Sequence, residues 1–332
     1  MRSTNTASAE HGTRITQTAG GGTRVALDAA EPCLGDACDG RDKAGLRWSM
    51  WTQAFGGQGY VNGDNTTGSA RADIATSGGA TGVDVQLTPE LLLGFTAGAT
   101  SASYTLGAAA SSSSARSVVL GLYGGYTVGP AYLDASAGYG RGNFTTQRNV
   151  NTGTIAEQIN GNFDGDLFGG KVEGGWRFAV DRHTFTPFAG LTVQTLRQNG
   201  YTESSRDLGS NAPGVLGLTV QPQTTTSVRS TLGSQISTTL PFDGRTNVRP
   251  RLKLGGAHEF NTDRTTNASL SVLAPSQSFT VAGSRQAADP AIVSAGVDFD
   301  IGGVVRLFAQ FDGDFSDNAQ SWSGTGGIRL YW

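Results

Sequence analysis

Apolar and polar residues alternate with a period of two from Leu46 to the last residue, and this constrains the possible folds more than any other feature. The clearest segment runs from 248 to 260, where apolar residues alternate with Arg249, Arg251 and Lys253. Successive side chains of a β-strand point to opposite faces, so this pattern predicts strands with one apolar and one polar face. Twelve such segments occur, the last of them at the C-terminus.

The length of these segments separates two all-β architectures. They run for about 10 to 16 residues, whereas about 9–11 suffice for a tilted strand to cross a bilayer and ordinary strands have about 5–6. Tight connections at 129–130, 180–183, 243–244 and 302–303 alternate with long polar ones at 141–162, 199–223 and 261–288. Short turns at one end and long loops at the other are typical of outer-membrane barrels. We therefore predict an all-β fold, a twelve-stranded antiparallel transmembrane β-barrel, with a secreted β-sandwich or β-helix as the alternative.

The composition is compatible with a barrel that has a polar interior. Charged residues make up 15% of the chain and the formal net charge is −3, which excludes a polybasic nucleic-acid-binding protein and a highly charged disordered chain. No apolar run reaches the roughly 18 residues of a transmembrane helix. The first ten residues lack the apolar core of a secretory signal peptide, so we expect the sequence to be a piece of a longer precursor.

The polar faces of the predicted strands would line a lumen of mixed charge, which holds water and can hydrogen-bond an inserted segment. The alternative is that these charges pair across neighbouring strands and only brace the barrel. The residues are Arg47, Lys171, Glu173, Arg177, Arg229, Arg249, Arg251, Lys253, Asp298, Arg306 and Arg329. On the apolar face, the candidates for an aromatic girdle, with ordinary lipid-facing bulk as the alternative, are Trp48, Tyr126, Tyr139, Trp176 and Trp332.

Residues 1–44 differ from the predicted barrel domain at 45–332, and we expect them to be a partly flexible linker or the end of a preceding domain. Residues 23–31 predict two turns of helix that end at Pro32. Cys33 and Cys38 are expected to form a small disulfide loop in an oxidising envelope, with free thiols as the alternative. A metal site is disfavoured because the nearest histidine, His11, lies far along a Gly-rich stretch.

The side chains needed for catalysis are not grouped in this sequence. A Gly-x-Ser-x-Gly nucleophile motif is missing, and His11, His183 and His258 lie far apart. Asp298 and Asp300 alternate into the predicted lumen, where paired structural charges are expected more than an acid–base pair. We predict no enzyme activity, no cofactor and no metal.

Residues 46–332 resemble the translocator domain of a type V autotransporter. The similarity rests on motifs spread along the chain: Trp51–Gly56, Gly121–Tyr126, Tyr132–Tyr139, Glu173–Phe178, Pro187–Leu191, Gln198–Tyr201, Val228–Gly233, Pro250–Leu252, His258–Phe260, Phe279–Gly283 and Asp312–Asp314. The last strand also resembles the C-terminal signal read by the barrel assembly machinery, with Thr325, Gly327, Leu330 and Trp332 in its four places. The family usually ends in Phe, so Trp332 departs from the pattern.

The resemblance implies a linker helix in the pore and the transport of an upstream passenger to the cell surface from the bacterial outer membrane. The implied partners are outer-membrane lipid, the assembly machinery and the chain's own passenger, with no nucleic acid and a monomeric barrel. Some members cut their own linker at an Asn, but no Asn occurs between Asn5 and Asn62. A simple porin, or an adhesin acting through its long loops, is the alternative. The residues expected to contact the linker, Glu173 and Arg229 foremost, are Glu173, Arg177, Arg229, Arg249, Arg251, Lys253 and Arg306.

Overall fold

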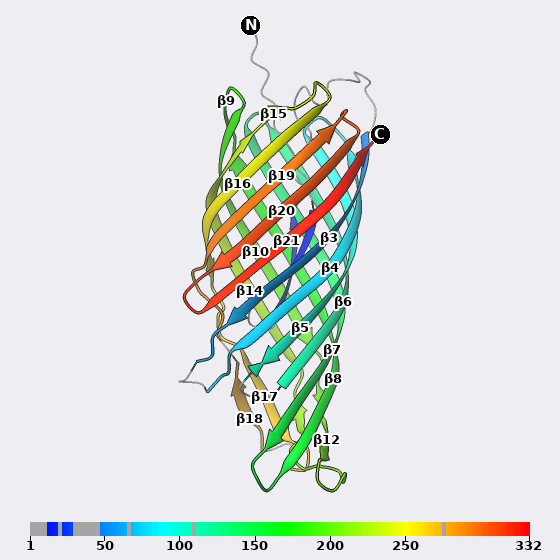
Figure 1. Cartoon of the computed structure of the whole chain (residues 1–332), viewed down its shortest axis with the longest axis vertical. Coiled ribbons are helices and arrows are strands. Elements are labelled where there is room, and N and C mark those ends of the chain that lie inside the picture. The colour runs from blue at the N-terminus through cyan, green and yellow to red at the C-terminus, as the bar shows by residue number, and fades with distance from the viewer. Residues whose placement is uncertain are drawn as a thin grey trace.

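The computed structural model describes residues 12–18, 22–28, 47–64, 68–107, 111–273, 277–283 and 285–332, and its main sheet closes into a barrel (Figure 1). Neighbouring strands follow the order β8-β7-β6-β5-β4-β3-β21-β20-β19-β16-β14-β10, and β10 pairs back with β8. The barrel strands are β3 (Arg47–Val61), β4 (Ala72–Gln86), β5 (Leu91–Leu106), β6 (Ser111–Val128), β7 (Ala131–Asn151), β8 (Ala156–Trp176), β10 (His183–Gln198), β14 (Gln223–Thr238), β16 (Thr246–Glu259), β19 (Ala291–Ile301), β20 (Val305–Phe315) and β21 (Ala319–Tyr331). The predicted closed, antiparallel twelve-stranded barrel is therefore confirmed.

The alternation in the sequence becomes an alternation between lumen and outer surface. In β3, Ser49 and Trp51 are buried inside the barrel while Trp48 and Met50 are exposed outside it. The first and last barrel strands close the ring, because β21 pairs with β3 along its whole length and Trp332 exchanges two backbone hydrogen bonds of 3.1 Å with Trp48. Closure gives each of the twelve described barrel strands a paired neighbour on both sides.

Tight turns join the strands at one end of the barrel, where the C-terminus also lies (Figure 1). Gly129 and Gly244 have φ angles of 56° and 76°, a left-handed conformation that favours glycine at both turns. Asp243 accepts backbone hydrogen bonds from Arg245 and Thr246 across its turn, and these bonds lower the pKa of its carboxyl. Short strands β9 (Phe178–Val180) and β15 (Leu240–Pro241) continue the pairing towards two of these turns.

At the opposite end of the barrel, the structure has strands where the sequence predicted three long loops. Strands β7 and β8 stay paired from one end of the barrel to Asn151 and Ala156, so the predicted loop at 141–162 is wrong and the connection spans only 152–155. Strands β7 and β8 can be longer than a bilayer requires, because cross-strand pairs stabilise them beyond it. Phe144 and Phe163 form one such pair, with stacked rings.

The two other predicted loops contain a second sheet. It is four-stranded and has the order β11 (Tyr201–Thr202), β13 (Leu218–Val220), β17 (Thr265–Leu270), β18 (Phe279–Ala282). The additional strand β12 (Ser204–Asp207) pairs with the far end of β8. The connections at 199–223 and 261–288 therefore fold together and against the extended β7–β8 hairpin.

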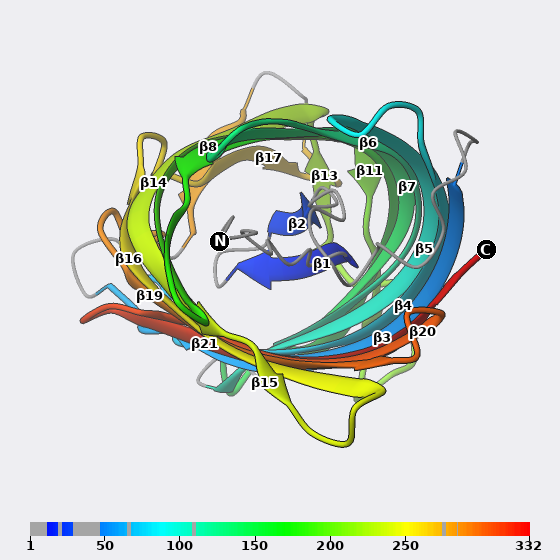
Figure 2. The same ribbon diagram turned by 90° about the horizontal axis from the view of Figure 1, so that it is seen from above.

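A second hairpin lies inside the barrel. Strands β1 (Gly12–Thr18) and β2 (Gly22–Asp28) pair antiparallel, and the view from above shows them within the ring of barrel strands (Figure 2). Strand β1 approaches β3, β4 and β5, whereas β2 approaches β6, β7, β8 and β10. The predicted helix at 23–31 is wrong for 23–28, because a partner strand supplies the hydrogen bonds and β-branched residues such as Val25 favour strands.

The predicted helix also covered residues 29–31, which lie outside the described residues. Cys33 and Cys38, the residues of the predicted disulfide, lie outside them as well. In the described ranges of the chain, no helix is long and apolar enough to cross a membrane.

Candidate functional site

The lumen is the candidate functional site, because the charged side chains of the barrel strands gather there. All of the predicted lumen residues lie on the inward face of their strands, and most are buried or half-buried, with Arg47 exposed at the start of β3. Among the residues that the structure describes, three groups of paired inward charges connect different sets of strands.

The first group joins β16, β19 and β20 near the tight turns. Arg306 Nε donates to Asp300 Oδ1 at 2.5 Å, and Arg249 forms an ion pair with the other oxygen of Asp300. Arg251 Nη1 donates to Asp298 Oδ2 at 2.6 Å. Asp298 faces Arg249 directly in the ladder, and Asp300 faces Arg306. Opposite charges on adjacent strands therefore neutralise one another. This pairing across neighbouring strands is the alternative that the sequence left open for the lumen charges.

The second group locks the seam between the first and last barrel strands. Arg329 Nη1 of β21 donates to both oxygens of Asp84 on β4, at 2.9 and 3.0 Å, and to Ser49 Oγ on β3 at 2.8 Å. Tyr123 Oη of β6 donates to Asp84 at 2.7 Å and accepts a hydrogen bond of 2.7 Å from Trp51 Nε1. The side chains of Asp84 and Arg329 are only 3% and 2% exposed.

Sequence reasoning named Arg329 but not its partners in this network. In the sequence, Asp84 is a polar residue between two valines, and Tyr123 lies in a Gly-rich motif. Asp84 faces Ser49 directly in the ladder, a cross-strand pair that only the register reveals. Nothing local in the sequence joins residues that are 245 positions apart.

The third group spans the lumen wall between distant strands. Lys253 Nζ of β16 donates to both oxygens of Glu173 on β8 at 3.0 Å, above β14 and β10, which lie between them. Its ammonium group lies 3.9 Å from the centre of the Phe188 ring, and Tyr132 Oη donates to Glu173 at 3.2 Å. Arg229 Nη1 of β14 similarly reaches Asp314 of β20 at 2.7 Å.

Several cationic groups in the lumen still have hydrogen-bonding capacity. Arg229 Nε, Arg249 Nε and Arg329 Nη2 are buried and make no hydrogen bond within the described part of the chain. The guanidinium of Arg177 stacks on the Tyr132 ring, with its carbon 4.5 Å from the ring centre. Buried donors favour an acceptor such as a backbone carbonyl, because an unsatisfied buried N–H costs about 1–3 kcal/mol.

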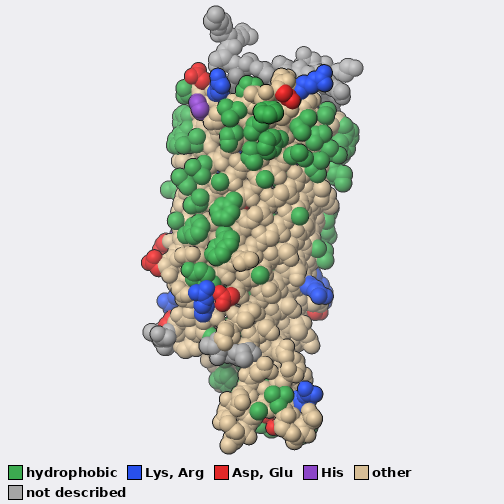
Figure 3. Space-filling view, viewed as in Figure 1, with side chains coloured by type: hydrophobic (Ala, Val, Ile, Leu, Met, Phe, Trp, Pro, Cys, Tyr) green, Lys and Arg blue, Asp and Glu red, His purple; other side chains and the backbone are tan. Residues whose placement is uncertain are grey.

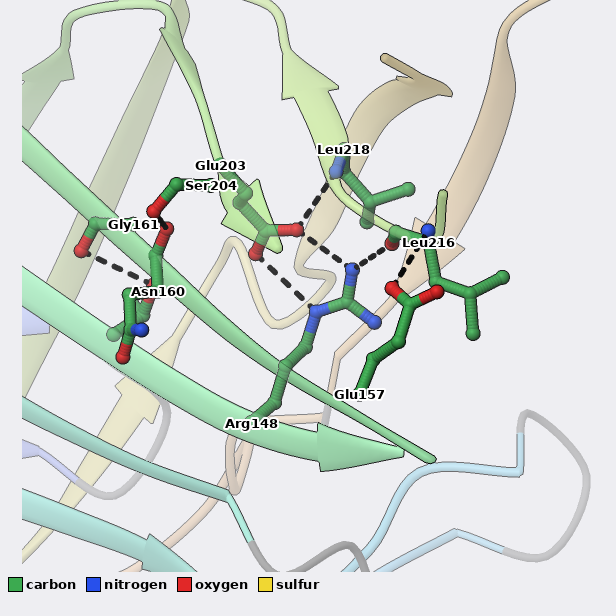
Figure 4. Close-up of polar contacts among 9 residues, drawn as sticks. Arg148, Glu157, Asn160, Gly161, Glu203, Ser204, Leu216 and Leu218 are labelled. Carbon is green, nitrogen blue, oxygen red and sulfur yellow. Dashed lines mark hydrogen bonds and ion pairs between the residues drawn. The ribbon is translucent and has the colours of Figure 1, made fainter. Parts of the chain in front are cut away.

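At the outer end of the barrel, which is the end opposite the tight turns, two buried carboxylates anchor the connection between β10 and β14 (Figure 4). Glu157 of β8 accepts backbone hydrogen bonds from Val215 at 2.8 Å and Leu216 at 2.9 Å. Glu203 accepts a backbone hydrogen bond from Leu218 at 2.9 Å and a side-chain hydrogen bond from Arg148 Nη2 at 2.6 Å. This network, which sequence reasoning missed, fixes the second sheet beside the outer end of the barrel.

An aromatic stack lies on the inward side of the same extension. The ring centres of Phe144 and Phe163 are 4.9 Å apart, and those of Phe163 and Tyr201 are 4.5 Å apart. Burial, with a further contribution from the charge of Glu203, raises the pKa of the Tyr201 phenol. The phenol therefore stays neutral across the physiological range.

The outer surface carries the apolar residues and the predicted girdle aromatics. Figure 3 shows apolar side chains gathered over the upper part of the barrel, with charged side chains above and below them. Trp48, Tyr126, Trp176 and Trp332 are exposed near the tight-turn end, and Tyr139 is exposed farther out. These aromatics therefore face outwards, as predicted.

The residues of the predicted C-terminal signal lie at the seam. A side chain at Gly327 would come within 2.3 Å of the Phe308 ring and 2.5 Å of the Thr52 carbonyl, so only glycine fits there. Leu330 and Trp332 point outwards and are 44% and 62% exposed. The apolar positions of this strand are therefore presented to the surroundings of the barrel.

Comparisons with known proteins agree with this geometry. A family model described as "Autotransporter beta-domain" matches residues 50–312. An extracellular serine protease of Serratia marcescens is 29% identical over 283 residues, which cover 84% of this chain and 25% of that protein. The chain thus spans about a quarter of the length of the curated relatives that it matches.

Solved structures show the same fold. The translocator domain of the autotransporter NalP from Neisseria meningitidis aligns with a TM-score of 0.64 and 19% identity, covering 88% of this chain and 90% of that one. The β-domain of the Bordetella autotransporter BrkA aligns with a TM-score of 0.61 and 20% identity, covering 85% of this chain and 98% of that one.

Proposed function

This chain belongs to the autotransporter β-domain family and is an outer-membrane translocator unit, and we propose that it exports an N-terminal passenger to the cell surface. Residues 1–44 would be the linker or the end of that passenger, and 45–332 the barrel that anchors it. The further partners in this proposal are outer-membrane lipid and the barrel assembly machinery, and the barrel acts as a monomer. The β-domain family is a translocator family, and we propose that the chain itself has no enzyme activity.

The observation that carries the proposal is the β1–β2 hairpin inside the barrel. It precedes the barrel in the chain and approaches both halves of the wall, through β3–β5 on one side and β6–β8 and β10 on the other. A channel that conducts freely needs an empty lumen, whereas a translocator needs a lumen that can hold its own polypeptide. A porin is therefore the less favoured function.

The lumen has the chemistry that such a segment requires. The buried N–H groups of Arg229 and Arg249 that make no hydrogen bond to the described residues can donate to backbone carbonyls of the inserted chain. The remaining predicted contacts would support them through charge–dipole interactions in a site of low dielectric constant. These are Glu173, Arg177, Arg251, Lys253 and Arg306. Because most of these charges are already paired with one another, the inserted chain meets little net field and can slide.

Protease accessibility on intact cells tests the export function. The chain is expressed with a signal peptide and a reporter fused ahead of Met1, and protease is added to the cells. We expect the reporter to be cleaved while the barrel remains in the outer membrane and shows the heat-modifiable migration of a folded barrel. A reporter that stays protected in the periplasm, with a correctly folded barrel, would contradict the proposal.

Site-specific photo-crosslinking tests the lumen contacts separately. A photoreactive residue at Arg229 points inwards, whereas the same residue at the neighbouring Ser230 points outwards and is the matched control. We expect a crosslink to residues 12–28 from position 229 only. Equal crosslinking from both positions would contradict the assignment of Arg229 as a linker contact.

The predicted C-terminal signal is proposed to direct assembly through Gly327, Leu330 and Trp332. Leu330 and Trp332 are exposed on the outer face, where another protein can reach them before the barrel enters lipid. Removal of Trp332 should reduce the yield of folded barrel in cells more than it reduces refolding of the purified chain in detergent. Equal losses in both assays would assign Trp332 a role in stability alone.

A further inference from the structure

A group of polar and charged side chains lies on the outward face of β6, β7, β8 and β10. Buried neighbours such as Ser117 and Leu167 point into the barrel, so the alternating positions point outwards. This outer arginine cluster consists of Arg116, Arg141, Asn143, Asp164, Asp166 and Arg197. The ladder brings it together, since one row runs from Arg116 through Asn143 to Asp164 and the next from Arg141 through Asp166 to Arg197.

The cluster has more positive groups than its carboxylates neutralise. Arg141 Nη2 lies 3.4 Å from Asp164 Oδ2, and Asn143 donates to the other oxygen of Asp164 at 2.5 Å. Arg116 and Arg197 have no carboxylate partner among the residues that the structure describes, and Arg197 lies over the Phe168 ring at 5.1 Å. Two exposed guanidinium groups are therefore available to an anion from outside.

The next outward-facing row towards the tight turns is apolar and aromatic. It contains Leu120, Tyr139 and Phe168 in direct register, with the Tyr139 and Phe168 ring centres 5.3 Å apart. Tyr139 Oη donates to Asp166 at 2.7 Å and so joins the two rows. An arginine that faces lipid is far more costly at the middle of a bilayer than near its surface, so this cluster belongs at the level of the lipid headgroups.

A shallow groove of about 490 Å³ lies on the outer surface next to the cluster. It is lined mostly by small residues of β3, β4, β5 and β21, together with Gln58, Phe311 and Trp322. Ser101, which lines the groove, pairs directly with Arg116 across the β5–β6 ladder. The groove can therefore hold an acyl chain of a lipid whose headgroup is bound at Arg116.

We propose that the outer arginine cluster binds the phosphorylated sugar headgroup of a glycolipid in the outer leaflet, with one acyl chain in the adjacent groove. Guanidinium groups bind phosphate through two parallel hydrogen bonds, which suits Arg116 and Arg197. Asp164 and Asn143 position Arg141 between them, and Asp166 positions Tyr139. This site goes beyond the proposed export function, because nothing in the passage of a polypeptide through the lumen uses the outer face of β6–β10.

The binding of purified lipid A to the full chain in detergent tests the proposal. The variant R116Q/R141Q/R197Q removes the cluster, and R71Q/R206Q/R285Q removes three other arginines with the same change in net charge. Because the first variant removes three donors of charge-assisted hydrogen bonds, we expect it to bind at least about tenfold more weakly. The control should bind as the wild type does, and both variants should keep the heat-modifiable migration of a folded barrel.

Two further probes separate a lipid site from a general anion site. Lipid A without its phosphates should bind at least about tenfold more weakly to the wild type, by the same reasoning. Inorganic phosphate at the same concentration should not compete. Unchanged binding in the cluster variant, equal binding of the dephosphorylated lipid, or competition by inorganic phosphate would each overturn the proposal. If R116Q/R141Q/R197Q loses lipid binding but still exports the reporter, the result supports the lipid site and leaves the proposed translocator function intact.

Discussion

The seam network allows a sharp test, because the barrel contains two ion pairs of equal length but different burial. Arg329 Nη1 lies 2.9 Å from Asp84 Oδ2, and Arg71 Nη2 lies 2.9 Å from Asp73 Oδ1. The side chains of the first pair are 2% and 3% exposed, whereas those of the second are 51% and 55% exposed. Arg329→Leu and Arg71→Leu therefore remove the same chemical contact from different environments.

We expect Arg329→Leu to lower the free energy of unfolding by about 3–5 kcal/mol, because Asp84 would remain as a buried charge without its cation. Only the hydroxyls of Ser49 and Tyr123 would still donate to it. Arg71→Leu should cost about 0–1 kcal/mol, as exposed ion pairs do. Adding Asp84→Asn to Arg329→Leu should recover part of the loss, because it removes the uncompensated charge.

The assay is reversible unfolding in urea of the barrel in lipid vesicles, followed by tryptophan fluorescence and by the heat-modifiable shift in gel migration. Equal losses for Arg329→Leu and Arg71→Leu would refute the reasoning that burial sets the strength of the seam. Additive losses in the Asp84→Asn/Arg329→Leu double variant would refute direct coupling between the two residues.

Three further predictions concern other parts of the barrel. Gly327→Ala should lower the free energy of unfolding by about 1–3 kcal/mol, because the added carbon would clash with a neighbouring ring and carbonyl. Gly324→Ala on the same strand is the control and should change urea unfolding little, because its added carbon meets nothing within 4 Å. Deletion of residues 1–44 should raise the conductance of the barrel in planar bilayers by emptying its lumen, and unchanged conductance would argue against a plug. Glu157→Leu leaves the backbone N–H groups of Val215 and Leu216 without their acceptor. Limited proteolysis should therefore cut the segment 208–217 faster, while the unfolding of the barrel stays nearly unchanged. An unchanged rate of cleavage would contradict an anchoring role for Glu157.

Some features of this protein follow from local sequence alone. The period of two assigns Arg249, Arg251 and Lys253 to the lumen because successive side chains of a strand must point to opposite faces. Gly129 and Gly244 mark tight turns because left-handed backbone favours glycine. Strand number and the antiparallel order of neighbours follow from these two local rules, so the closed barrel was predictable.

Other features depended on which strands meet, and the tertiary structure alone decided them. Lys253 pairs with Glu173 and Asp84 with Arg329 because curvature of the closed wall brings distant strands within reach. The helix prediction, over residues 23–28, and the loop predicted at 141–162 were wrong for a related reason. Residues 23–28 pair with β1, and 141–151 pair with β8, and such pairing depends on the presence of a partner strand. The outer arginine cluster likewise exists only in the register of four strands, since each arginine alone is an ordinary polar residue in the sequence.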